Sequence, residues 1–262
     1  MFVAVTLEQP AEVHDALAPY YDEFMEHRGY PSWVRRLEAL SLSVRPRGSR
    51  ALDVGCGTGK SIEPLLELGY AVTACDASPE MLARAAAKLR GGARLVWGAL
   101  PDLPQLGAFD YVSCLNDVVN YLLRVDELEA TFHALRANMT PDGVLVFDTS
   151  TQALYRTHYA RLRWREVEGA AILWRGETPH DFQPDGIARA AVEIFTPEGS
   201  AWRRTTSHHV QRHYSEEVVE RALAGAGLKL ESVYGQYDDG RPVRPLDPER
   251  HTKAVHVVTR LP

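Results

Sequence analysis

The run Leu52-Asp53-Val54-Gly55-Cys56-Gly57-Thr58-Gly59-Lys60 joins the end of an apolar strand to a glycine-rich turn and then to a helix. Residues 50–54 carry the apolar pattern of a buried parallel strand, and the apolar residues between 61 and 68 recur with helical spacing. Glycines remove Cβ atoms, so the backbone can approach a ligand closely and present N–H groups at a helix N-terminus. This layout predicts a binding site for a nucleotide-type ligand.

Three ligand classes use such turns, and the spacing of the glycines separates them. The dinucleotide fingerprint G-x-G-x-x-G would need glycine at position 60, which is Lys60. The phosphate loop G-x-x-x-x-G-K-[ST] is matched at positions 59–61 but would need its first glycine at Val54. The pattern D-x-G-x-G-x-G fits without change and resembles the first motif of class I S-adenosylmethionine-dependent methyltransferases. The resemblance implies S-adenosyl-L-methionine as the cofactor. Its expected contacts in this turn are Asp53, Gly55, Cys56 and Gly57.

A second apolar strand, over residues 71–75, ends at Asp76. Asp76 lies about 20 residues beyond the glycines, the distance at which an acidic residue reaches ribose hydroxyls in nucleotide-binding βαβ units. It could instead cap the next helix, but Ser78 already supplies an N-cap there. We therefore expect the Asp76 carboxylate to accept both ribose hydroxyl protons. By the resemblance, Ala77 and Met81 lie beside the nucleoside, although a methionine on a helix is by default part of the core.

A third strand, over residues 94–97, leads into Gly98-Ala99-Leu100-Pro101-Asp102-Leu103-Pro104. This segment is similar to the family's G-D-x-x-x-L-P segment, in which the aspartate usually bonds the adenine amino group. Ala99 stands at that position here. The adenine would then be held by backbone groups of Ala99 and Leu100 or by a displaced side chain such as Asp102.

A fourth strand, over residues 109–114, is followed by a polar segment that ends in Asn120-Tyr121-Leu122. Segments after the carboxyl ends of parallel strands are where such sheets bind ligands. Here the resemblance narrows to bacterial small-molecule methyltransferases of the aminosugar N,N-dimethyltransferase and glycine N-methyltransferase kind. It implies that Asn116 faces the methionine part of the cofactor. The residues expected to reach the acceptor are Asp117, Asn120 and Tyr121; helix capping or a surface hydroxyl is the alternative for each.

The order of elements predicts the fold. Strands alternate with helices from about residue 50 to 148, which is typical of an α/β protein with a doubly wound, mostly parallel sheet, seven-stranded and Rossmann-like by the resemblance. Turn residues then separate antiparallel strands over 162–177, 187–196 and 201–214. A helix over 215–224 and strands over 228–234 and 252–259 would complete the sheet. The expected parts are an N-terminal helical cover over 1–45, a cofactor-binding core over 46–150, an antiparallel β flap over 151–214 and a C-terminal helix and strand pair over 215–262.

The flap contains the densest cluster of titratable side chains, at residues 208–214. Strand periodicity puts His209, Gln211 and His213 on one face, and the resemblance places His209 and Gln211 in a lid over the acceptor. A helical stretch from Ala18 to Leu40 resembles the family's N-terminal helix; it implies that Tyr21 bonds the methionine carboxylate and that Tyr20 lines the acceptor site. The candidate catalytic residues are His209, Tyr21 and Tyr121, with structural or solvated side chains as the alternative.

Composition limits the partners. The chain has 262 residues, 45% of them hydrophobic, and a net charge of −6, so it offers no basic face suited to nucleic acid. No apolar stretch reaches membrane-spanning length, and the first residues lack a secretory leader pattern. The three cysteines, Cys56, Cys75 and Cys114, are typical of reduced thiols in a cytoplasmic protein. No metal site is expected. We expect a monomer or homodimer.

The predicted reaction is in-line displacement of a methyl group onto a nitrogen or oxygen of a small molecule, such as a secondary metabolite. Alignment of the reactants can supply most of the catalysis, so the sequence need not contain an unmistakable general base. Two alternatives stay open. One is a methyltransferase-like cyclase or a protein that binds S-adenosylmethionine without methylating, because fold does not determine reaction. The other is a P-loop nucleotide hydrolase, which ATP binding would support.

Overall fold

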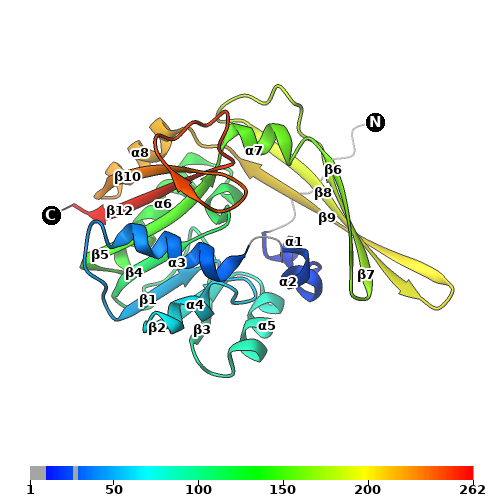
Figure 1. The fold of residues 1–262 in the computed structure, drawn as a ribbon, viewed down its shortest axis with the longest axis horizontal. Helices are drawn as coiled ribbons and strands as arrows, with labels where there is room; N and C mark the ends of the chain where they lie inside the picture. The colour runs from blue at the N-terminus through cyan, green and yellow to red at the C-terminus, as the bar shows by residue number, and fades with distance from the viewer. Residues whose placement is uncertain (1–9, 26–28, 262) are drawn as a thin grey trace.

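The main sheet is doubly wound and mostly parallel, as predicted (Figure 1). The computed structural model describes residues 10–25 and 29–261, so the expectation about a secretory leader, which concerns the first residues, lies outside them. The strands of this sheet are β1 (Arg50–Val54), β2 (Ala71–Asp76), β3 (Arg94–Trp97), β4 (Phe109–Cys114), β5 (Met139–Ser150), β10 (Leu228–Gln236), β11 (Pro242–Val243) and β12 (Lys253–Arg260). Their order is β11-β10-β12-β5-β4-β1-β2-β3, so the two-residue β11 adds an eighth strand to the seven expected.

Five neighbouring strands, from β3 to β5, are parallel, whereas β12 pairs antiparallel with both β5 and β10. Helices cover both faces. The helices that contact this sheet or its helical layers are α3 (Tyr30–Ser41), α4 (Ile62–Glu67), α5 (Pro79–Leu89), α6 (Val125–Ala137) and α8 (Glu216–Gly225). Helices α3 and α4 bury apolar side chains in one core, and α6 and α8 do so in the other. Within the described ranges, no helix combines the length and apolar character needed to cross a bilayer.

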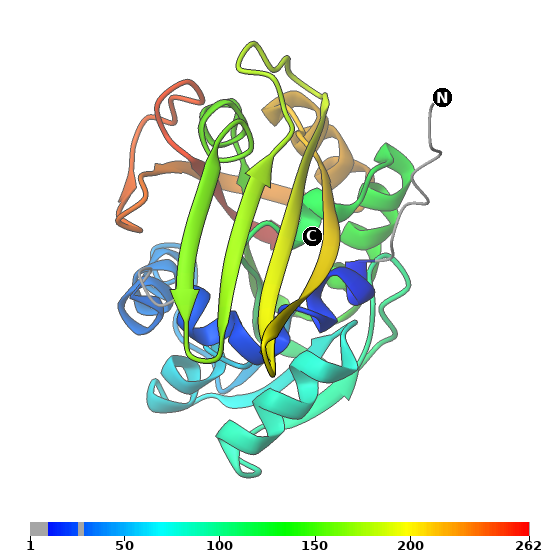
Figure 2. The ribbon, with the colours of Figure 1, turned by 90° about the vertical axis from the view of Figure 1, so that its right-hand side faces the viewer.

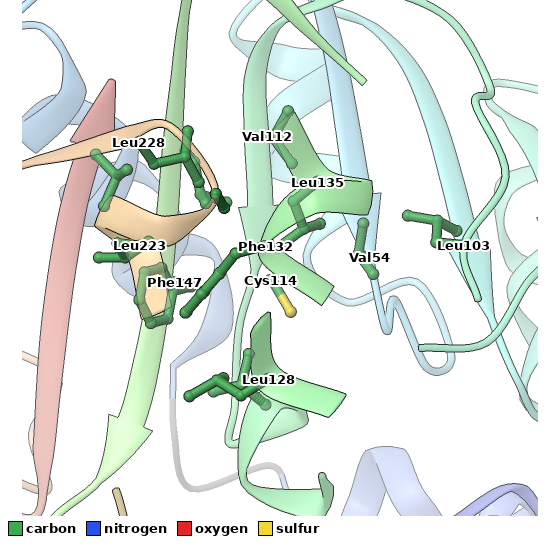
Figure 3. Packing of buried hydrophobic residues seen from close by; sticks show 14 of the residues in the cluster. Val54, Leu103, Val112, Cys114, Leu128, Phe132, Leu135, Phe147, Leu223 and Leu228 are labelled. Atoms are coloured by element: carbon green, nitrogen blue, oxygen red, sulfur yellow. The ribbon is translucent and has the colours of Figure 1, made fainter. Parts of the chain in front are cut away.

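The core under α6 and α8 shows why these segments form this layer (Figure 3). Leu128, Phe132 and Leu135 follow helical spacing along α6 and are fully buried. They meet strand side chains such as Phe147, whose ring centroid lies 5.2 Å from that of Phe132. This packing holds the carboxyl ends of β1 and β4 in place. The strand order reverses between these two strands, which is where open α/β sheets bind ligands.

The flap is a second, antiparallel sheet of four strands, which Figure 2 shows face-on in front of the N-terminal helices. Its strands are β6 (Leu162–Val167), β7 (Ala170–Gly176), β8 (Ile187–Glu198) and β9 (Ala201–Arg212), and α7 (Gln152–Thr157) precedes them. The prediction of a single strand over 162–177 was wrong, because the chain turns back at Gly169. Gly169 adopts a left-handed φ of +75°, which glycine accepts readily.

The N-terminal cover consists of α1 (Pro10–Asp15), the 3₁₀ turn η1 (Ala18–Tyr20), α2 (Tyr21–Phe24) and then α3. The predicted continuous helical stretch is therefore broken into short pieces before Tyr30. Leu17 and the aromatic side chains of this region pack against Val167, Ile172 and Val192 of the flap. The cover thus lies between the flap and the main sheet, where it forms part of the wall of the cavity described next (Figure 2).

Candidate functional site

A cavity of about 1240 Å³ opens at the carboxyl ends of β1, β2 and β4. It is lined by the glycine turn, by the loops after β2, β3 and β4, by the N-terminal cover and by the flap. Binding sites for one drug-sized molecule are typically about 300–1,000 Å³. This cavity is larger, so it can hold two small molecules side by side. A cofactor and an acceptor can therefore share a single space.

The glycine turn of residues 55–59 is shaped by three left-handed glycines, Gly55, Gly57 and Gly59, of which the first two face the cavity. Gly55 has a φ of +72°, and a Cβ there would meet Cγ2 of Val118 at 2.5 Å. Gly57 has a φ of +53° and donates its N–H to Oδ2 of Asp76 at 2.7 Å. Any larger residue at either position would be strained, and at Gly55 it would also clash. The turn and the end of β2 therefore form one hydrogen-bonded unit in the cavity wall.

Asp76 points its carboxylate at backbone donors on two sides. Besides Gly57, the N–H of Ser78 donates to Oδ1 at 2.9 Å, while the Ser78 hydroxyl caps α5 by accepting from Met81 N at 3.0 Å. The capping role is thus filled by Ser78. A carboxylate has about four acceptor positions, so Asp76 keeps capacity for two further donors. Ala77, Met81, Ala99 and Leu100 line the cavity beside it, although Met81 is also almost fully buried.

Asp53 and Cys56 lie deeper in the turn. The Asp53 side chain is 1% exposed and accepts hydrogen bonds from Ser61 at 2.5 Å and from Ser113 at 2.6 Å. Burial raises its pKa to about 6, although the two serine hydroxyls oppose this effect. Asp53 therefore fixes the turn through these two hydrogen bonds, and it also belongs to the cavity lining. Burial also raises the pKa values of the three cysteine thiols, that of Cys75 to about 12, so they stay protonated at neutral pH.

The loop after β4 is held by a buried ion pair that the sequence analysis missed. Asn116 and Asp117 both adopt left-handed φ values, near +69°. Their N–H groups donate to the two oxygens of Asp148 at 2.8 Å each. Lys253, which is 1% exposed, donates to Asp148 at 3.1 Å and also to Asp117. Lys253 and Asp148 therefore hold two strained residues of the cavity wall in place.

Tyr21 and Asn116 are brought together from opposite ends of the sequence. The Asn116 amide donates to the Tyr21 hydroxyl at 3.2 Å, and both side chains line the cavity. The cover that carries Tyr21 is fastened to the core by Asp22, which pairs with Lys88 at 2.5 Å and accepts a hydrogen bond from Thr58. Burial alone would raise the pKa of Asp22, but these two partners outweigh it and lower the pKa.

His209 and Tyr121 meet at the flap end of the cavity. Nδ1 of His209 lies 2.7 Å from the Tyr121 hydroxyl, and Nε2 is buried with no hydrogen-bond partner among the described residues. Burial, with a smaller effect of His14, lowers the pKa of His209 well below its ordinary value. Burial raises the pKa of Tyr121. Both groups are therefore neutral at physiological pH.

Three predicted acceptor residues lie outside the cavity lining. The Asn120 amide is fully buried, donates to Arg212 O at 2.8 Å and accepts from Ser150 N at 2.9 Å. The Gln211 carbonyl accepts from the Tyr155 hydroxyl at 3.1 Å, and Tyr20 packs on the flap with Leu17. The expectation that these side chains touch the acceptor is corrected. Asn120 links β9 to β5, Gln211 links β9 to α7, and Tyr20 packs the cover against the flap.

Other cavity residues were not anticipated. His14, Tyr159 and Trp174 line the flap end. The rings of His14 and Trp174 contact that of His209, and the ring of Tyr159 contacts that of Trp174. The sequence carries no local signal for them, because they come from α1, the turn after α7 and β7. Among the described residues, no group of three or more His, Cys, Asp or Glu side chains is arranged to hold a metal ion.

Comparisons with known proteins bear on the family and the fold. A family model described as "Methyltransferase domain" matches residues 51–143. Putative methyltransferase GWCH70_2453 of Geobacillus sp. (strain WCH70) is 33% identical over 237 residues, covering 87% of this chain and 94% of that protein. The dTDP-3-amino-3,6-dideoxy-alpha-D-glucopyranose N,N-dimethyltransferase of Streptomyces fradiae is 26% identical over 239 residues, covering 88% and 91%. The crystal structure of a S-adenosylmethionine-dependent methyltransferase from Clostridium acetobutylicum ATCC 824 superposes with a TM-score of 0.78 at 22% identity, covering 95% of this chain and 99% of that one, which supports the fold.

Proposed function

Because the chain belongs to the class I S-adenosylmethionine-dependent methyltransferases, we propose that it methylates a nitrogen or oxygen atom of a small molecule bound beneath the flap. One observation carries this proposal. The glycine turn and the His209–Tyr121 pair line the same cavity, whose volume of about 1240 Å³ suits a cofactor and an acceptor together. The similarity to an aminosugar N,N-dimethyltransferase supports a small acceptor but leaves its identity to experiment.

The residues at the sheet end of the cavity fit S-adenosylmethionine. Asp76 keeps two acceptor positions for ribose hydroxyls after binding the N–H groups of Gly57 and Ser78. Met81 and Leu100 offer apolar surfaces to the adenine, and Tyr21 and Asn116 lie on the side nearer the flap, where we place the methionine part. When bound, the cofactor supplies an electrophilic methyl group on a sulfonium. The buried carboxylate of Asp53 beneath the turn favours a cation in the cavity.

At the flap end, we assign proton acceptance to His209. In the tautomer that this role requires, Nδ1–H donates to the Tyr121 oxygen and the lone pair of Nε2 faces the acceptor. Tyr121 then orients the imidazole, as the third group of a catalytic triad orients its base. The flap and the cover enclose the reacting groups and limit the water that would compete for hydrogen bonds. Most of the rate enhancement is assigned to alignment and a smaller part to His209.

Replacing His209 with glutamine should lower turnover by about 10²–10⁴-fold, the usual contribution of a general base. Affinity for S-adenosylhomocysteine should change less than twofold, because we place His209 on the acceptor side alone. His133→Gln, an exposed position on α6, is the matched control and should behave like the parent. Steady-state kinetics with radiolabelled S-adenosylmethionine and calorimetry provide the two readouts. Parent-like turnover in His209→Gln would remove the histidine from the reaction.

The depressed pKa of His209 also sets the pH dependence of the parent. Burial keeps the imidazole neutral at pH values below those at which histidine ordinarily titrates. Turnover should therefore show no titration centred near pH ~6.5 and should decline only at lower pH. Below about pH 6.5 the unfolded chain binds a proton at this position that the folded chain does not. The free energy of unfolding should therefore fall as the pH is lowered through that range, and this dependence should be weaker in His209→Gln.

A further inference from the structure

Five aromatic rings form a continuous wall at the flap end of the cavity. They belong to His14, Tyr121, His209, Trp174 and Tyr159, all of which line the cavity. The ring centroids of His14 lie 5.2 Å from Tyr121 and 5.5 Å from His209. Trp174 lies 5.4 Å from His209 and 5.1 Å from Tyr159. We call these five rings the aromatic wall. Three elements of the fold, the cover, the loop after β4 and the flap, thus contribute to one surface.

Polar groups of the aromatic wall already have partners in the protein, among them the Tyr121 hydroxyl, which lies 2.7 Å from Nδ1 of His209. The indole N–H of Trp174 donates to His158 O at 2.9 Å, and Leu17 and Leu154 supply aliphatic surface beside the rings. Nε2 of His209 is the buried polar atom of this wall without a hydrogen-bond partner among the described residues. A ligand that fits here therefore presents apolar or aromatic surface to the wall and one polar group to His209.

None of the carboxylates of the described cavity lining belongs to the aromatic wall, and each of them has partners in the protein. They are Asp53, Asp76, Asp117 and Glu127. Asp53 and Asp76 belong to the glycine-turn unit, and Asp117 pairs with Lys253. Glu127 accepts from the N–H groups of Leu123 and Arg124 at the start of α6. An alkylammonium group against the wall would therefore be desolvated on a surface that contributes no carboxylate, and it would face the cofactor's own positive charge.

We infer that the acceptor is a phenol, an aromatic ring carrying the hydroxyl group that becomes methylated; this inference rests on the proposed function. A phenolic oxygen keeps a lone pair while it still holds its proton. In one position it can therefore donate its O–H to Nε2 of His209 and attack the methyl carbon with the lone pair. An alkylammonium has no lone pair until it has lost its proton. An aliphatic alcohol has a lone pair but is far less acidic than a phenol, whose pKa is about 10 in tyrosine.

The step balances with groups already described. The phenol oxygen forms a bond to the methyl carbon as the carbon–sulfur bond breaks, and the sulfonium becomes a thioether. The phenolic proton moves to Nε2 of His209, while Nδ1–H remains on the Tyr121 oxygen. The products are an aryl methyl ether, S-adenosylhomocysteine and a proton, which His209 releases readily because its pKa is depressed.

The first test incubates the full chain with ¹³C-methyl-labelled S-adenosylmethionine and an equimolar panel of phenols, catechols, primary and secondary amines, amino sugars and aliphatic alcohols. NMR of the labelled methyl group identifies the atom to which it is bonded. We expect aryl ethers, with at least about tenfold preference for 4-methylphenol over 4-methylbenzylamine. Label on nitrogen or on an aliphatic oxygen would overturn the phenol inference and leave the proposed function intact. No label in any compound would count against the proposed function itself.

A second test uses the aromatic wall directly. Trp174→Leu should raise the KM for the preferred phenol by about tenfold to a hundredfold and leave S-adenosylhomocysteine affinity unchanged. Trp202→Leu is the matched control, because Trp202 lies on the same flap, is 62% exposed and is absent from the described cavity lining. Equal KM values in the two variants would contradict a role for the wall in acceptor binding. Circular dichroism of both variants establishes that the flap remains folded.

Discussion

Lys253→Met is expected to lower the free energy of unfolding by about 3–5 kcal/mol, the usual result of removing one partner from a buried ion pair. The lysine is 1% exposed and lies between Asp148, which is fully buried, and Asp117. Without it, the fully buried Asp148 carboxylate loses the lysine ammonium that lies 3.1 Å away. Chemical denaturation followed by circular dichroism measures the change.

Two further variants show whether the loss comes from the unpaired charge. Lys253→Met combined with Asp148→Asn should lose less stability than the single variant, because the buried Asp148 charge that lost its lysine is then removed as well. Lys229→Met, at a lysine with 57% side-chain exposure, should change the free energy of unfolding by at most about 0.5 kcal/mol. If the losses in the free energy of unfolding from Lys253→Met and Asp148→Asn simply added in the double variant, the loss in Lys253→Met would not come from the buried charge.

The second large effect is expected at the cofactor. Asp76→Asn should weaken binding of S-adenosylhomocysteine by at least about tenfold, because charge-assisted hydrogen bonds contribute about 1.5–3 kcal/mol each. The variant keeps the shape of the side chain but loses the charge and one acceptor oxygen. Asp102→Asn is the control and tests the displaced adenine contact considered from sequence; Asp102 is exposed and is not among the described lining residues, so its affinity should equal that of the parent. If Asp76→Asn bound S-adenosylhomocysteine as tightly as Asp102→Asn does, the proposed contact between Asp76 and the ribose would be wrong.

Local patterns in the sequence were enough to predict which residues meet at the end of the cavity that is formed by the main sheet. The glycines, Asp76 and Ser78 lie within one βαβ unit, so their spacing along the chain determines how they meet in space. The doubly wound order of the strands followed from the same alternation of apolar segments. Strand periodicity likewise predicted that His209 and Gln211 share a face, and both are buried.

The flap end could be predicted only in part. Gly169 carried too weak a turn signal within 162–177 to indicate a hairpin. Asn120 and Gln211 have the right residue types for an acceptor site, but their amides bond to the chain instead, and periodicity does not distinguish these outcomes. Lys253 reads as an ordinary strand residue. Its importance depends on contacts with residues more than a hundred positions away, which a single sequence does not reveal.

The most direct test of the account is a crystallographic map of the protein with S-adenosylhomocysteine. The map should place the ribose hydroxyls within hydrogen-bond distance of the Asp76 carboxylate, with the sulfur directed along the cavity toward Nε2 of His209 and room between them for one acceptor group. A nucleoside bound away from Asp76, or a sulfur turned away from His209, would contradict the division of this cavity into a cofactor end and an acceptor end.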